Sequence, residues 1–182
     1  KHTSPWRKGL VKSELVKNIL LVNMPWAPVY VPSLQLGTLK ACLARADYGS
    51  AVSYPNLRFA ASLGMDEYQW ISSQGFLNFV SEWVFCSHLS KDCDDEERLD
   101  RLLERYVGEL STLGIPVNRA MERFDLLGLK RRMLHVRRDL APRFIESEAA
   151  HPEVEQAHVI AFTGTFNQAA SALAMARQIK ER

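Results

Sequence analysis

Short apolar runs alternate along the chain with longer segments in which apolar residues recur every three or four positions. Ile19–Val22 is a run of the first kind, and Pro25 and Pro28 follow it closely. Neither a sheet ladder nor a helix continues easily through these prolines, so the pattern predicts a buried parallel strand that ends in a loop. In open α/β sheets, ligands bind at the carboxyl edge where such loops lie.

An amphipathic helix is predicted after this loop. It starts at Pro32, which suits an early helical position, or at Ser33, whose hydroxyl can cap the first turn. Its apolar stripe consists of Leu34, Leu36, Leu39 and Leu43, with Ala41 and Cys42 between them. We expect the helix to end near Asp47-Tyr-Gly49, where the glycine can take the left-handed closing conformation.

Two further apolar runs extend the α/β pattern. Residues 50–54 predict a second strand, which gives a right-handed parallel unit with the first strand and the helix. Residues 157–162 predict a third strand, followed by a helix over residues 169–180. Between this strand and helix, Thr163 and Thr165 flank Gly164. Backbone can approach a bound group closely at a glycine, and hydroxyls can donate to it; the same residues could simply end the strand and cap the helix.

The middle of the chain, about residues 60–150, has helical patterns and no obvious strand, so it predicts a long helical insertion. Its residues 119–145 are expected to be helical, with interruptions at Gly128 and Pro142. One aromatic-rich stripe is either core packing or a wall over a ligand, and consists of Phe76, Phe79, Val80, Trp83 and Val84. The fold class is therefore α/β: a Rossmann-like parallel sheet with a helical insertion, truncated to three strands where about five are usual.

Composition excludes few classes of protein. The 182 residues are 47% hydrophobic and carry a formal net charge of +2. A net charge this small favours neither a protein that binds nucleic acid over its whole surface nor one with an acidic tail. A basic cluster could grip phosphate, a leader peptide or nucleic acid, but apolar residues interleave with it as in any amphipathic helix. The cluster consists of Lys130, Arg131, Arg132, Arg137, Arg138 and Arg143. We therefore expect these basic side chains to form the solvent-exposed face of an amphipathic helix.

The three cysteines, Cys42, Cys86 and Cys93, are too few and too scattered for a secreted disulfide framework, so a cytoplasmic location is expected. Cys86, His88 and Cys93 match no standard zinc spacing. No apolar run approaches the roughly 18 residues that span a bilayer, so no membrane partner is expected. Residues 1–17 are expected to be a flexible leader, and a start at Lys1 suggests a trimmed chain.

Several short segments together resemble the amino-terminal, cobalamin-binding region of cobalamin-dependent radical S-adenosylmethionine enzymes. They are Leu20-Leu-Val-Asn-Met-Pro25, Pro32-Ser-Leu-Gln-Leu-Gly37, Tyr54-Pro-Asn-Leu-Arg-Phe59, Glu82-Trp-Val-Phe85 and Phe162-Thr-Gly-Thr-Phe-Asn-Gln168. The resemblance is greatest to the C-methyltransferases that mature ribosomally made peptides, and it implies a Rossmann-like domain over residues 18–182. The cofactor-binding residues it implies are Met24, Pro25, Trp26, Ser33, Gln35, Asn56, Thr163, Gly164, Thr165, Phe166 and Asn167.

Two departures from that family shape the expectations. Many cobalamin carriers supply a histidine to cobalt after the first strand, whereas residues 23–28 contain none, so the lower face of the corrin is not expected to be ligated from this loop. The Cys-x-x-x-Cys-x-x-Cys motif of the iron–sulfur cluster is also absent. No catalytic residue is therefore predicted, and S-adenosylmethionine and a [4Fe-4S] cluster are expected only in a carboxyl-terminal domain outside this chain.

Two functions follow as hypotheses. The resemblance implies that the chain binds cobalamin, as methylcobalamin, for a methyltransferase acting on a peptide substrate. The alternative, from the residues alone, is a non-catalytic α/β module that docks a protein or peptide. In either case the open edge after the third strand predicts possible self-association, and no nucleic-acid partner is expected.

Overall fold

A three-stranded parallel sheet organises the computed structural model, which describes residues 18–73, 78–90, 96–114, 125–165 and 167–182. Its strands are β1 (Ile19–Val22), β2 (Ser50–Ser53) and β3 (Val159–Phe162), in the order β2-β1-β3. The register pairs Ile19 with both Ser50 and Val159. The predicted α/β class with a Rossmann-like parallel sheet is confirmed. Residues 1–17, the expected leader, lie outside the described residues.

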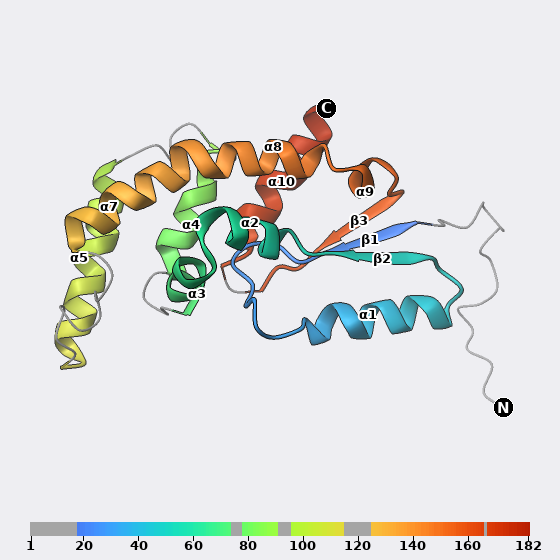
Figure 1. Ribbon diagram of the computed structural model, residues 1–182, viewed down its shortest axis with the longest axis horizontal. Helices are drawn as coiled ribbons and strands as arrows, with labels where there is room; N and C mark the ends of the chain where they lie inside the picture. Colours follow the sequence, from blue (N-terminus) through green and yellow to red (C-terminus); the bar gives the residue numbers. More distant parts are fainter. Residues whose placement is uncertain (1–17, 74–77, 91–95, 115–124, 166) are drawn as a thin grey trace.

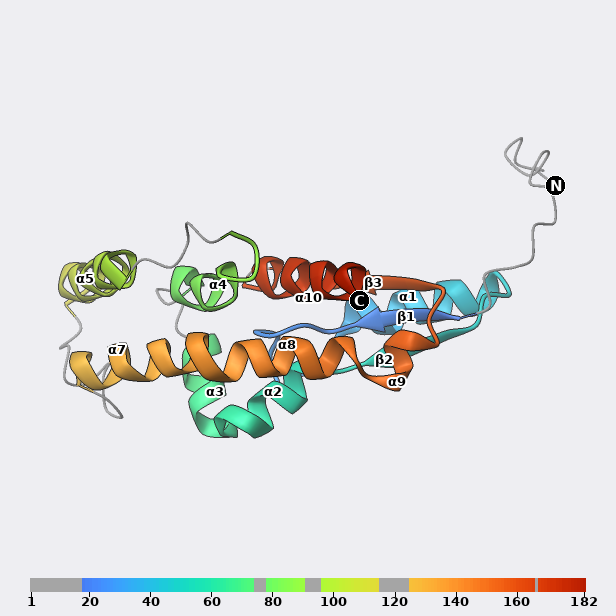
Figure 2. The same cartoon turned by 90° about the horizontal axis from the view of Figure 1, so that it is seen from above.

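Helices cover the two faces of this sheet very differently (Figures 1 and 2). Helix α1 (Leu34–Arg45) lies on one face, alone among the described helices. On the other face lie α8 (Ala141–Ala149), α9 (Pro152–Glu155) and α10 (Ala169–Glu181), and α8 packs against α10. We call the face under α8 and α10 the closed face and the face under α1 the open face.

Local chemistry explains both ends of α1. Ser33 is the N-cap, and its hydroxyl accepts a hydrogen bond from the Leu36 amide at 3.4 Å, which resolves the choice between Pro32 and Ser33. At the other end the helix closes at Arg45, with Ala46 as the C-cap, next to the predicted end. Asp47, with φ of 64°, takes the left-handed conformation that was expected of Gly49. The prediction of a glycine was wrong because aspartate also tolerates this region, and the Tyr48 amide already closes the turn onto Leu43.

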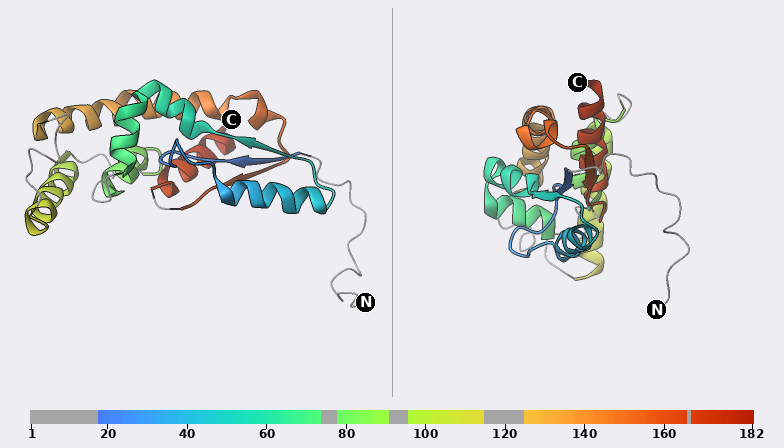
Figure 3. Two further views of the ribbon diagram at one scale, coloured as in Figure 1. Left: turned by 60° about the horizontal axis from the view of Figure 1, so that its bottom comes forward. Right: turned by 90° about the vertical axis from the view of Figure 1, so that its right-hand side faces the viewer.

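The middle of the chain is helical where it is described, and no strand occurs there between β2 and β3. The helices before α8 are α2 (Pro55–Leu63), α3 (Met65–Ser73), α4 (Asn78–Cys86), α5 (Glu96–Thr112), α7 (Leu126–His135) and the π-helical turn η4 (Val136–Leu140). Figure 3 shows them extending beyond the carboxyl ends of the strands. The predicted long helical insertion is thereby confirmed.

The interruptions predicted at Gly128 and Pro142 do not occur, because α7, η4 and α8 follow one another without a gap. Gly128 lies in the first turn of α7, where its amide donates to the Asp125 carboxylate at 2.5 Å. Pro142 lies in the first turn of α8, directly after η4. A proline is tolerated there because the preceding π turn already departs from the regular hydrogen-bond ladder that proline would break.

A cluster of aromatic rings joins the helical insertion to the sheet. Trp26, in the loop after β1, lies 5.3 Å from Phe59 of α2 and 5.1 Å from Tyr68 of α3, measured between ring centroids. Phe85 of α4 and Phe144 of α8 complete the cluster around Phe59. These rings are buried, and they hold four helices against one loop.

The aromatic-rich stripe in α4 also packs into this core where it is described. Val80, Trp83 and Val84 are at most 3% exposed. Phe76 and the side chain of Phe79 lie outside the described residues.

Candidate functional site

The carboxyl edge of the sheet is hollowed beside β3. A hollow of about 660 Å³ lies between the start of α1 and the end of β3, and we call it the α1–β3 hollow. It is lined by Leu34, Gln35, Leu36, Thr38, Leu39, Ala161, Phe162, Thr163, Gly164 and Thr165. Its wall is mainly apolar, with the threonine hydroxyls and the Gln35 amide as polar groups, as is common in small-molecule sites.

Two smaller hollows continue along the same edge toward β2. The central hollow, about 200 Å³, shares Leu34, Gln35 and Thr165 with the α1–β3 hollow. The Asn56 hollow, about 300 Å³, shares Asn23 and the loop residues Pro28, Val31 and Pro32 with the central one. Tyr54, Asn56 and Leu57 close its far side. Neighbouring hollows share wall residues, so the three adjoin one another along the carboxyl ends of the strands, and we call them together the depression.

A buried polar junction fixes the loops around this depression. Thr163 accepts a hydrogen bond from the Met24 amide at 3.3 Å and donates to Asn23 Oδ1 at 3.3 Å. The Gln168 side chain donates to the same oxygen and, at 2.8 Å, to the Met24 carbonyl. Asn23, Thr163 and Gln168 are each at most 6% exposed. Because buried polar groups are costly when unpaired, this junction specifies how the β1 and β3 loops meet.

The amino terminus of α10 is already capped by a carboxylate. Glu82 of α4 accepts hydrogen bonds from the Ala169 amide at 3.1 Å and the Ala170 amide at 2.6 Å. A helix amino terminus is ordinarily a favourable place for a phosphate. Here the internal carboxylate takes that place, so the helix start offers no free anion site.

The structure brings most of the sequence-predicted site residues to the depression. Those that line it are Ser33, Gln35, Asn56, Thr163, Gly164 and Thr165. Three others lie elsewhere: Met24, Pro25 and Trp26 line none of the three hollows, and the Pro25 carbonyl accepts a hydrogen bond from Ser171. Trp26 is 2% exposed and its indole donates to the Ser81 carbonyl, so it belongs to the core.

The last two predicted residues follow Thr165. Asn167 adopts a left-handed conformation with φ of 67° and is not among the lining residues of the hollows. Phe166 lies outside the described residues.

Asn56 stands out among the lining residues. It is 1% exposed, and its Nδ2 atom lies 3.5 Å from the Pro28 carbonyl. Its Oδ1 atom is buried without a hydrogen-bond partner in the described part of the chain. An orphaned buried acceptor is rare in native structures, because it loses the hydrogen bonds it made to water.

Sequence reasoning did not single out Asn23, Glu82 or Ser171, although all three shape this region. Asn23 had a usable signal, since it is the first polar residue after a buried strand. Glu82 gave a weaker one, as a lone acid among the apolar residues of α4. Ser171 gave none, because a serine inside a small-residue helix is indistinguishable by pattern from its neighbours.

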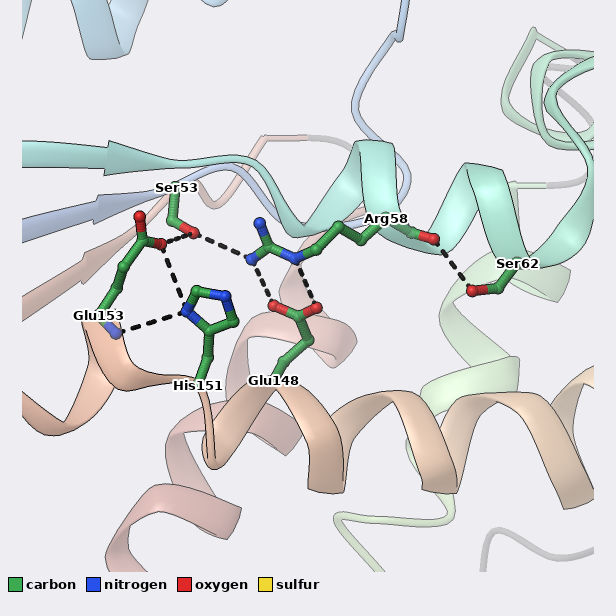
Figure 4. A network of polar contacts seen from close by, with 6 residues as sticks. All are labelled: Ser53, Arg58, Ser62, Glu148, His151 and Glu153. Atoms are coloured by element: carbon green, nitrogen blue, oxygen red, sulfur yellow. Dashed lines mark hydrogen bonds and ion pairs between the residues drawn. The ribbon is translucent and has the colours of Figure 1, made fainter.

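A second polar network lies at the end of β2, on the closed face (Figure 4). Arg58 of α2 makes a bidentate pair with Glu148 of α8, at 2.7 and 2.5 Å, and also donates to Ser53 Oγ at 3.0 Å. Ser53 in turn donates to Glu153 at 2.7 Å. Hydrogen bonding to Glu148 raises the pKa of Arg58 against the opposing effect of burial.

His151 does not turn this network into a nucleophilic triad. Its Nδ1 accepts from the Glu153 amide and lies 3.6 Å from the Glu153 carboxylate, whereas Ser53 bonds the carboxylate rather than the imidazole. A serine activated for attack would bond the imidazole. We therefore interpret the network as a clamp that ties α2 and β2 to the α8–α9 connection.

The basic cluster is largely neutralised by acids from other helices. Lys130 pairs with Asp100, Arg132 with Glu67 and Arg138 with Glu96, at 2.6, 2.7 and 2.5 Å. Arg137 is buried, donates to the Trp83 carbonyl and stacks on the Trp83 ring. These contacts join helices to one another.

Metal-binding and membrane-spanning features are not found in the part of the chain that the structure describes. No group of three or more histidine, cysteine or acidic side chains is placed to hold a metal ion there. Cys93 lies outside the described residues. Among the described helices, none is both long and apolar enough to cross a membrane.

Comparisons with known proteins add no relatives. Neither the models of protein families, nor the curated proteins, nor the solved structures gave a significant match to this chain.

Proposed function

We propose that the chain binds cobalamin at the carboxyl edge of its sheet and serves as the cobalamin-binding part of a radical S-adenosylmethionine methyltransferase that acts on a peptide. The observation that supports this most is the depression, in which the α1–β3, central and Asn56 hollows adjoin one another along the ends of the strands. A broad, flat cofactor with an appended tail needs a wide site with room on more than one side of the sheet's central strand. Ordinary Rossmann-like sheets bind ligands at this edge.

The chemistry of the lining residues fits that cofactor in two respects. The corrin is largely apolar across its face, and the wall of the depression is mainly apolar. Its rim carries carboxamide groups, which need hydrogen-bond partners such as Gln35, Asn56 and Thr165. None of the described histidines lines the three hollows, so the proposal does not include ligation of cobalt by one of them.

In this proposal, bound cobalamin would supply a transferable methyl group, and this chain would supply binding and orientation. The junction of Asn23, Thr163 and Gln168 would hold the β1 and β3 loops in fixed positions under the ligand. Leu34, Leu36 and Leu39 would exclude water along the α1 side. Since Glu82 caps α10, an anionic tail would lie in the α1–β3 hollow rather than at the start of that helix.

A second candidate function is supported by the open face. Leu34 is 83% exposed and Leu39 is 48% exposed, and Tyr30 and Val31 nearby are each more than 60% exposed. Clustered exposed apolar side chains are typical of surfaces that dock a partner. A non-catalytic module that binds a protein or peptide through α1 would explain them equally.

Cobalamin retention tests the first proposal directly. The purified chain would be incubated with hydroxocobalamin or methylcobalamin under anaerobic conditions, desalted, and examined by ultraviolet-visible spectroscopy. Gly164→Trp is the informative variant, because a side chain at Gly164 meets open space within the α1–β3 hollow. Gly108→Trp is the matched control, since it adds the same ring at an open position in α5.

We expect wild type and Gly108→Trp to retain the corrin bands and Gly164→Trp to lose most of them. Circular dichroism would establish that both variants are folded. Folded wild-type protein that retains no corrin would contradict the proposal and favour the docking module. Equal retention by both variants would show that cobalamin binds elsewhere.

A further inference from the structure

The unpartnered oxygen of Asn56 marks a place where a ligand can supply a donor. Asn56 lies at the start of α2, one residue after Pro55, and its own amide donates to the Asn23 carbonyl at 3.1 Å. The backbone bond fixes the position of the residue, and the contact of Nδ2 with the Pro28 carbonyl orients the side chain. Its Oδ1 remains buried without a partner in the described chain, in the wall of the Asn56 hollow.

Asn23 contributes the complementary group to the same hollow. Its Oδ1 is occupied by Thr163 and Gln168, which fixes the orientation of its amide. Its Nδ2 has no hydrogen-bond partner among the residues that the structure describes. Asn23 and Asn56 both line this hollow, so the unpartnered amide donor and the unpartnered amide acceptor belong to two residues of the same wall.

We infer that Asn23 and Asn56 form a subsite for a primary carboxamide. The carbonyl oxygen of such a group would accept from Asn23 Nδ2, and its NH₂ would donate to Asn56 Oδ1. A carboxylate ligand would instead face the Asn56 oxygen with a second acceptor, and an ester or a dialkylated amide would leave that oxygen unpaired. The apolar rim of Tyr30, Val31 and Leu57 would cover the alkyl chain that carries the group.

This inference rests on the proposed function only in naming cobalamin as the ligand, one of whose rim carboxamides would occupy the subsite. The subsite itself is inferred from Asn23 and Asn56 alone. Its chemistry can therefore be tested with a small amide, separately from cobalamin.

Nuclear magnetic resonance of the ¹⁵N-labelled chain provides that test. Propionamide would be titrated while the side-chain NH₂ signals of Asn23 and Asn56 are followed. N,N-dimethylpropionamide is the matched control ligand, because it keeps the carbonyl and lacks the N–H donor. We expect both signals to shift saturably with propionamide and to respond at least fivefold more weakly to the dimethyl compound. Equal responses, or none, would overturn the inference.

The Asn56→Leu variant separates a ligand-binding role from a structural one. The substitution removes the buried unpaired oxygen together with the long 3.5 Å bond from Nδ2 to the Pro28 carbonyl, so thermal stability should change little. The same variant should lose the Asn23 response to propionamide and bind cobalamin about fivefold to tenfold more weakly, the effect of about one hydrogen bond. A marked loss of stability with unchanged binding would assign Asn56 to the scaffold instead.

The two proposals fail in distinguishable ways. If propionamide gives the expected response and folded wild-type protein retains no cobalamin, the carboxamide subsite stands and the proposed function fails. If cobalamin binds equally to wild type and Asn56→Leu, and propionamide gives no response, the proposed function stands and the subsite fails.

Discussion

The two faces of the sheet differ in how completely they are covered. On the closed face, α8 buries Phe144, Ile145 and Glu148, and α10 buries four small residues together with Met175. On the open face, α1 buries only Leu36 of its own residues. β3 is partly exposed along its whole length, with Val159 42% exposed.

This difference assigns the stability of the fold mainly to the closed face and leaves the open face available for binding. Apolar area removed from water stabilises a fold in proportion to its extent. The main buried cluster includes residues of the insertion helices, α8 and α10, and no residue of α1. The open face buries little apolar area, so it contributes little to the stability of the fold. Its exposed leucines and its hollow are therefore free to serve a ligand or a partner, and substitutions should affect the two faces unequally.

The largest expected effect is in the aromatic core. Phe59→Ala removes a fully buried ring that contacts Trp26, Phe85 and Phe144. We expect the free energy of unfolding to fall by about 3–5 kcal/mol, the usual cost of such a cavity. Urea denaturation followed by circular dichroism would measure it. Leu39→Ala on the open face is the control and should change the free energy of unfolding by less than about 0.5 kcal/mol. If the two variants lost similar stability, the proposed difference between the faces would be wrong.

The clamp at the end of β2 should give the next effect. Glu148→Gln keeps the shape of the side chain but removes the charge that pairs with Arg58, whose side chain is 40% exposed. Because water partly solvates the arginine, we expect a loss of about 1–2 kcal/mol rather than the larger cost of a fully buried pair. Glu109→Gln, in the more exposed pair with Arg105, is the control and should cost less than about 0.5 kcal/mol. Equal effects would mean that the clamp adds nothing.

A smaller effect is expected at the junction of the β1 and β3 loops. Thr163→Val preserves the β-branched shape and leaves the buried Met24 amide without its acceptor. The loss should be about 1 kcal/mol in the free energy of unfolding. Thr112→Val, at an exposed threonine of α5, provides the same substitution without a buried partner. If both variants behave alike, the junction is not a determinant of stability.

The smallest expected effect depends on pH. Burial, together with the nearby Arg137, lowers the pKa of His88 below its ordinary value of 6.5. The unfolded chain therefore binds a proton on acidification before the folded chain does, so stability should decline as the pH falls through about 6.5. His88→Asn should flatten this decline between pH 7.5 and 5.5 in denaturation experiments. An unchanged slope would show that other groups cause it.

How far the sequence predicts the molecule depends on how local each feature is. β1, the cap at Ser33 and the start of α10 at Ala169 follow from patterns of a few residues. The Thr163–Gly164–Thr165 loop was also identified from local strand-end chemistry, whereas Asn56 was predicted only through the family resemblance.

Features that depend on distant segments were not predictable in this way. Trp26 was expected near a ligand, yet it lies in the core because α2, α3 and α4 bring aromatic rings around it. Glu82 caps a helix nearly ninety positions later in the chain. Nothing in the residues around either position encodes those partners.

The π turn η4 has a consequence for how this chain can tolerate insertions and deletions. A π turn contains one residue more than the α-helical turn it replaces, and each residue rotates a helix by about 100°. Met133 before the turn and Ile145 after it are both fully buried and belong to the same hydrophobic core. Removing one residue from Val136–Leu140 would restore a regular ladder but change the relative phase of these two helices. One of them would then present charged residues to the interior, so the length of this segment is constrained more strictly than its composition.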